Sequence, residues 1–219
     1  MTGFPRSPKL TRAGLVLIDP GSGAVTRIVS LQYAADTLTR KLTAQAVEAE
    51  GDRSHPLRLT GPAVETITFD AELDATDQLE FPENNPSAVE TGLFPALAAL
   101  ESLLHPTVAQ LERQSAQRKS GSFEITPAET PLALFVWSRS RVVPVRLTDL
   151  SITEDFFDPA LNPIRAKVSL SLRVLSVADL GFEHRGGGLF MAYLQGKEAL
   201  AARAAAGQLG ELGLEGLPT

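Results

Sequence analysis

The stretch RAKVSLSLRVL, residues 165–175, establishes the fold class because apolar and polar side chains alternate through it without a break. Successive side chains of a β-strand point to opposite faces, so a period of two predicts a half-buried strand. The apolar phase comprises Ala166, Val168, Leu170, Leu172 and Val174, and the polar phase comprises Lys167, Ser169, Ser171 and Arg173. The face turned to solvent or to a partner is therefore cationic.

Three other regions predict strands. Residues 14–33 pass from an apolar run through the turn DPGSG into a second run, which is typical of a hairpin. Residues 131–152 form another pair around SRSR, and Pro144 within it predicts an edge strand or a bulge. Residues 64–74 alternate again, with Ile67, Phe69, Ala71 and Leu73 in the apolar phase. The chain is predicted to be mainly β (α+β) and antiparallel.

Ser87 can cap a helix, and a helical spacing up to Pro106 is shared by Leu93, Ala96, Leu97, Leu100 and Leu104, which predicts one amphipathic helix. Because proline is tolerated in the first turn, the stable helix is expected to start near Pro95. Residues 38–62 are polar and alternate little, which predicts a long loop with at most irregular strand. Residues 110–122 predict a polar connection.

The texture changes after residue 178, so we expect a β domain over residues 1–178 and a helical, partly flexible extension over 179–219. The glycines of HRGGG, residues 184–188, predict a hinge before a helix. Leu189, Tyr193 and Leu200 fall largely on one stripe of that helix, which favours docking on a neighbour. A chain stopped after Arg185 is expected to keep its fold.

Composition excludes several classes of function. The chain has 219 residues with 20 basic and 26 acidic side chains, and a net charge of -6 argues against nucleic acid as a partner. It has no cysteine, hence no disulfide, thiolate ligand or cysteine nucleophile. Neither a secretory signal nor a run of about 18 apolar residues is present. We expect a cytoplasmic protein without membrane insertion, released only by lysis.

Five carboxylates crowd residues 68–81, and Asp70, Glu72 and Asp74 occupy the first, third and fifth positions of a calcium loop. The required glycine and glutamate are replaced by Ala75 and Phe81, and on a strand the three carboxylates line up rather than converge. A solvated or partner-facing strip is the favoured interpretation, with an ion site or catalytic carboxylates as alternatives. Phosphate-loop and nucleophile-elbow motifs are absent, so no catalytic residue, metal or cofactor is predicted.

Four segments together resemble the contractile injection system tube protein family: residues 28–42, 64–78, 93–104 and 131–175. The last is the most specific, with the apolar-aromatic run at 135–137, Phe157 with Asp158, and the Pro-x-Arg-Ala entry at 163–166. The resemblance implies an antiparallel tail-tube-like β-barrel or sandwich with one packed helix. It also implies a hexameric ring of copies whose strands join into one inner wall.

In that family, members with a longer carboxyl end are adaptors between tube and spike. We therefore expect a structural baseplate component, not an enzyme, that acts as tube initiator or adaptor with inner tube, spike hub and other baseplate proteins as partners. The expected subunit or partner interface comprises Asp70, Glu72, Asp74, Lys167, Arg173, Leu189, Tyr193 and Leu200. A plain inner-tube subunit is the alternative within this class. From another class, a carboxylate-dependent hydrolase or a small-ligand-binding β-sandwich stays open.

Overall fold

Seven antiparallel strands form one sheet in the computed structural model, which describes residues 13–31, 33–46, 58–119, 130–204, 207 and 211. The strand order is β2-β1-β5-β6-β7-β4-β3. The strands are β1 (Ala13–Ile18), β2 (Val25–Leu31), β3 (Tyr33–Ala46), β4 (Leu59–Asp74), β5 (Leu132–Ser138), β6 (Arg141–Phe157) and β7 (Pro163–Val174). The helices are α1 (Thr76–Leu79), η1 (Pro82–Asn84), α2 (Pro86–Thr91), α3 (Phe94–Glu101), α4 (Val108–Lys119), α5 (Val177–Leu180) and α6 (Arg185–Ala201). The mainly β, antiparallel prediction is confirmed.

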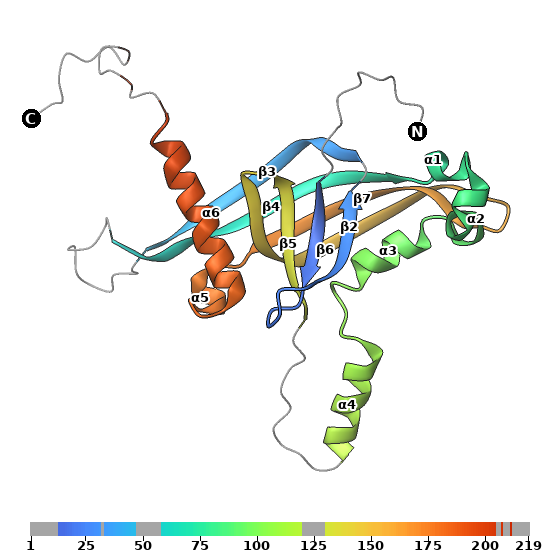
Figure 1. The fold of residues 1–219 in the computed structure, drawn as a ribbon, viewed down its shortest axis with the longest axis horizontal. Helices are drawn as coiled ribbons and strands as arrows, with labels where there is room; N and C mark the ends of the chain where they lie inside the picture. The colour runs from blue at the N-terminus through green and yellow to red at the C-terminus, as the bar shows by residue number, and fades with distance from the viewer. Residues whose placement is uncertain are drawn as a thin grey trace, which may run out of the picture.

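The sheet folds over on itself, so that β1, β2 and β5 cross the long strands β4 and β7 (Figure 1). β6 makes one corner, because residues 141–145 pair with β5 while residues 145–157 pair with β7. The second corner lies between β2 and β3, which are separated by one residue yet occupy opposite edges of the sheet. Strands that bend from one layer into the other are typical of orthogonal packing. β2 and β3 do not pair within the described ranges, so of the expected barrel or sandwich the structure has an open sheet folded into two layers.

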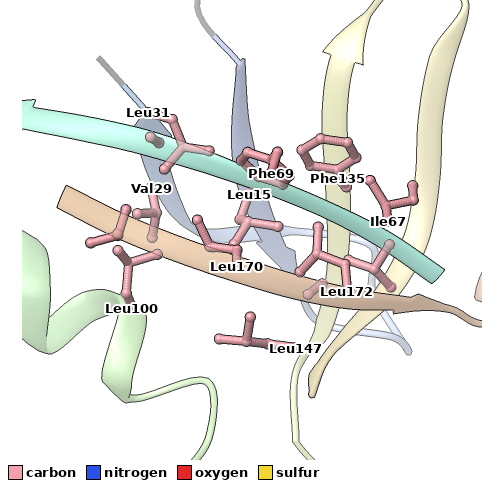
Figure 2. Close-up of a cluster of buried hydrophobic side chains, with 14 of the residues drawn as sticks. Leu15, Val29, Leu31, Ile67, Phe69, Leu100, Phe135, Leu147, Leu170 and Leu172 are labelled. Carbon is pink, nitrogen blue, oxygen red and sulfur yellow. The ribbon is translucent and has the colours of Figure 1, made fainter. Parts of the chain in front are cut away.

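The core fills the space between the two crossing layers. Leu15, Phe69, Phe135 and Leu170 meet there, as Figure 2 shows. The rings of Phe69 and Phe135 stack with centroids 5.1 Å apart. The apolar phases predicted for β4 and β7 both face this core, which confirms the strand periodicity.

Pro144 is buried inside the sheet and pairs with Leu134 in continuous register, so it lies neither on the predicted edge strand nor in a bulge. It stands where β6 leaves β5 for β7, and its carbonyl accepts a 2.9 Å hydrogen bond from the amide of Leu175. A residue without an N–H group is tolerated at this corner because the strand changes partners there.

The helix predicted over residues 87–106 is two helices, α2 and α3, separated at Gly92. Gly92 has a φ of 55°, and a Cβ at this position would lie 2.4 Å from the carbonyl oxygen of Pro163. That oxygen instead accepts a 2.9 Å hydrogen bond from the amide of Leu93. Leu97 and Leu100 bury the predicted apolar stripe of α3 in the core.

Two segments predicted as irregular are regular. Residues 38–46 belong to β3, which pairs along β4, and residues 110–119 belong to α4. β3 is an outer strand and α4 has no buried residue, so neither needs the strong apolar periodicity on which the prediction relied. Residues 59–62 of the predicted loop belong to β4, and residues 47–57 lie outside the described residues.

The predicted hinge at residues 186–188 is wrong, because these glycines form the first turn of α6. A Cβ on Gly187 would lie 2.0 Å from the carbonyl oxygen of Gly181, so the glycine permits close packing of helix against loop. Phe190 and Tyr193 of α6 are buried in the same core cluster as the sheet. α6 thus packs on the β domain; the domain boundary at residue 178 stays a prediction.

Candidate interaction surfaces

The four long strands β6, β7, β4 and β3 form a ribbon with one apolar and one polar face. Residues opposite each other in antiparallel strands share a face, and the register sets Asp70 against Ser169 and Glu72 against Lys167. Between the pairs Thr66–Arg173 and Asp74–Arg165, the outer face carries these polar or charged side chains: Thr39, Lys41, Thr66, Thr68, Asp70, Glu72, Asp74, Arg146, Asp149, Ser151, Thr153, Asp155, Arg165, Lys167, Ser169, Ser171 and Arg173. The apolar Val64 and Phe157 lie on the same face outside that stretch. The ribbon therefore offers a continuous hydrophilic surface.

Arg165 organises the charges at one end of this face. Its guanidinium lies 2.8 Å from the carboxylate of Asp74 and 3.2 Å from that of Glu72. Burial acts to raise the pKa of Asp74, but hydrogen bonds from Thr76 and Arg165 outweigh it and hold the pKa below its ordinary value. Asp74 ends β4, and its carboxylate accepts hydrogen bonds from the amide and the hydroxyl of Thr76, the first residue of α1.

The opposite charges of β4 and β7, which belong to the expected interface, are neighbours within one chain. Asp70 accepts a hydrogen bond from Ser169, and Arg173 pairs with Asp179 at 2.6 Å. Lys167 is exposed opposite Glu72. A role in contacts between subunits stays a prediction for the five charged residues of the expected interface: Asp70, Glu72, Asp74, Lys167 and Arg173.

The three α6 residues of the predicted interface differ in exposure. Tyr193 is buried, and Leu189 is half-buried against the cluster of Ile18 and Leu132. Leu200 is exposed and lines a shallow hollow of about 250 Å³. Within the predicted stripe, Leu200 is thus free to meet a partner while Tyr193 serves the core.

The residues that hold α6 against the β3–β4 hairpin were missed by the sequence analysis. Glu65 is only 3% exposed, and its carboxylate lies 2.6 Å from Arg40 and 3.0 Å from Lys197. Tyr193 donates to the same carboxylate at 3.5 Å. Burial acts to raise the pKa of Glu65, but the two cations that hydrogen-bond to it hold the pKa below its ordinary value. The feature of the sequence that could have indicated this cluster is Glu65 itself, a carboxylate in the same inward phase as Ile67.

The ribbon has two open edges. The outer side of β3, which is 14 residues long, is unpaired within the part of the chain that the structure describes. Residues 146–157 of β6 likewise pair only with β7 there. Unpaired strand edges are ready templates for pairing with another chain.

Candidate metal and catalytic residues are dispersed. No group of three His, Cys, Asp or Glu residues that could hold a metal ion occurs among the described residues. His184 caps α6 by accepting from the amide of Gly186, His105 is exposed, and His55 lies outside the described residues. None of the helices described here is long and apolar enough to cross a bilayer.

No protein-family model matches this chain, and no curated protein matches it. Among solved structures, it is similar to the "tail of empty GTA particle", solved with C6 symmetry, at 11% identity and a TM-score of 0.28. It is also similar to a chain of the "virion of native gene transfer agent (GTA) particle", at 10% identity and a TM-score of 0.27. Each match covers 74% of this chain and 90% of the other. TM-scores this low carry no weight for the function of this chain.

Proposed function

We propose that this chain is a structural subunit of a contractile, phage-tail-like particle and that it starts or adapts the inner tube at the baseplate. The observation that carries the proposal is the ribbon of long strands, which has an apolar face, a hydrophilic face and two open edges. Such a ribbon can join its copies into a wall, with the hydrophilic face toward a water-filled lumen.

Strand direction supports this arrangement. All three pairings within the ribbon are antiparallel, so β3 and the free half of β6 run in opposite directions. In a ring, rotation preserves strand direction, and β3 of one copy would meet β6 of the next as an antiparallel neighbour. The alternation then continues around the ring and leaves no open edge, which removes the hazard of unpaired strands.

The finer role rests on the segment after the last strand. In the family that the sequence resembles, chains with an added carboxyl segment are adaptors, and here α5 and α6 come after β7. An adaptor starts one tube and must not polymerise by itself. We therefore expect the isolated chain to be monomeric or weakly associated at micromolar concentration in mass photometry, and to form closed rings only with tube or spike partners.

Immunogold electron microscopy of particles that carry an epitope-tagged copy tests the proposal. Label at one end of each particle supports the adaptor role. Label along the whole tube, or long tubes formed by the isolated chain, would instead establish a plain tube subunit. Particles without label, from cells that express the tagged chain, would reject a structural role in the particle.

A further inference from the structure

Helix α4 carries a short apolar stripe, Val108 and Leu111, that no other part of the described chain buries. None of its residues is buried, and Figure 1 shows the helix standing apart from the sheet. Val108 is 71% exposed and Leu111 50% exposed, and the two lie one turn apart on α4. A helix of 12 residues is marginally stable without tertiary contacts. The stripe is therefore the face of α4 that gains most from a partner.

The charge of α4 indicates the chemistry of that partner. The helix has three cationic side chains, Arg113, Arg118 and Lys119, against the single carboxylate of Glu112. None of these four forms an ion pair within the described ranges. Arg118 lies two turns after Leu111 and is therefore on the same face of α4 as the apolar stripe. The matching surface should be acidic and partly apolar.

Residues 76–91 provide such a surface, which we call the α1–α2 surface. It carries four carboxylates, Asp77, Glu80, Glu83 and Glu90, and no lysine or arginine occurs from Thr76 to Glu112. None of the four forms an ion pair in the described part of the chain. Phe81 is 41% exposed and Val89 48% exposed. In one chain α4 and this surface lie apart, with α3 between them (Figure 1).

We propose that α4 of one copy docks on the α1–α2 surface of a second copy. Two different patches make this contact, so it is heterologous, and a succession of such contacts closes into a ring when the rotation permits. Apolar burial gives the contact its area, and the opposite charges set its orientation. The contact goes beyond the tail role and does not depend on it, because both patches belong to this chain.

Cysteine cross-linking tests the contact, since the chain has no native thiol. Ser115→Cys on α4 and Ser87→Cys on α2 are placed in separately tagged copies, mixed, and treated with a short bifunctional maleimide. Both sites are exposed, and serine and cysteine are close in size. A matched control replaces Ser115→Cys by Ser151→Cys on the outer face of β6, which is equally exposed. We expect the cross-linked heterodimer with the first pair and only background with the control.

Charge reversal separates docking from chance encounter. Arg118→Glu in the α4 copy should slow cross-linking about fivefold, because an exposed ion pair contributes up to about that factor to an association constant. Glu83→Arg in the other copy should restore part of the rate. A yield no higher than the control, or a rate unchanged by Arg118→Glu, would overturn the proposal.

A single chain with both Ser87→Cys and Ser115→Cys provides the remaining test at nanomolar concentration. If this chain links to itself while the mixed copies do not, α4 folds back onto its own surface and the contact between copies is refuted. If the copies cross-link but the particles carry no immunogold label, the role in the tail is rejected and the contact between copies stands. Labelled particles without cross-linking would reject the contact alone.

Discussion

Phe190→Ala should destabilise the whole protein because Phe190 is a core residue, although it lies on the last helix. The side chain is 5% exposed and belongs to the same cluster as Phe69 and Phe135. Replacing a buried phenylalanine by alanine costs about 3–5 kcal/mol, from lost transfer free energy and the cavity left behind. Since domains are stable by about 5–15 kcal/mol, the variant should lose about 30–50% of a mid-range total of about 10 kcal/mol.

Urea denaturation followed by circular dichroism measures this loss as a lower midpoint with an unchanged slope. The control is Leu200→Ala on the same helix, because Leu200 is 51% exposed and surface substitutions change stability by about 0.5 kcal/mol or less. Equal midpoints for the two variants would show that α6 does not complete the core. If Phe190 completes the core, a chain stopped after Arg185 should also lose cooperative unfolding. This is the opposite of the expectation from the sequence, in which glycines 186–188 were a hinge and the truncated chain kept its fold.

Three further predictions concern individual sites. Because the pKa of Glu65 is depressed, its ionised carboxylate stabilises the fold at pH values above the ordinary pKa of 4.5, and this stabilisation is lost as the pH falls through the lower pKa of the folded protein. The difference in urea midpoint between wild type and Glu65→Gln should therefore shrink from pH 6 to pH 3, and a constant difference would contradict the ion pairs. Gly92→Ala should cost about 1–3 kcal/mol, because it forces a side chain into a positive φ against a carbonyl; the control Gly188→Ala, in helical backbone with open space, should be neutral or stabilising in the same melt. Excess calcium should leave the melting temperature equal to that in excess chelator, because the carboxylates of residues 70–74 lie along a strand; an increase of several degrees with calcium would indicate a bound ion.

Strand periodicity predicted the sheet well where one face is buried. Residues 64–74 and 165–175 form β4 and β7 with the apolar phases predicted, because a core on one side enforces the alternation. β3 escaped prediction because an outer strand buries little, and Leu42 on its inward side is 51% exposed. α4 was not predicted because none of its residues is buried and its apolar stripe is only two residues long, too short to stand out in a polar segment.

The site was predicted less well than the fold. Sequence analysis placed Asp70, Glu72 and Lys167 correctly on the polar face, yet it could not show that β4 and β7 are adjacent in one chain, since register depends on distant pairing. Glu65 occupies an inward position but was overlooked, because a carboxylate among apolar inward residues is interpreted as the end of the strand. Its inward position is explained only by the two cations that pair with it. Those cations lie 25 residues before it and 132 residues after it.

The pairing of distant strands has a consequence for synthesis on the ribosome. β4 ends at Asp74, but its partner β7 starts only at Pro163, and β1 waits for β5. At about 5–20 residues per second, the roughly 90 residues between β4 and β7 take about 5–20 s to emerge. During that interval the β3–β4 hairpin exposes an apolar face and an unpaired edge to solvent. The nascent chain is therefore most exposed to aggregation midway through translation, when a holding chaperone would protect it best.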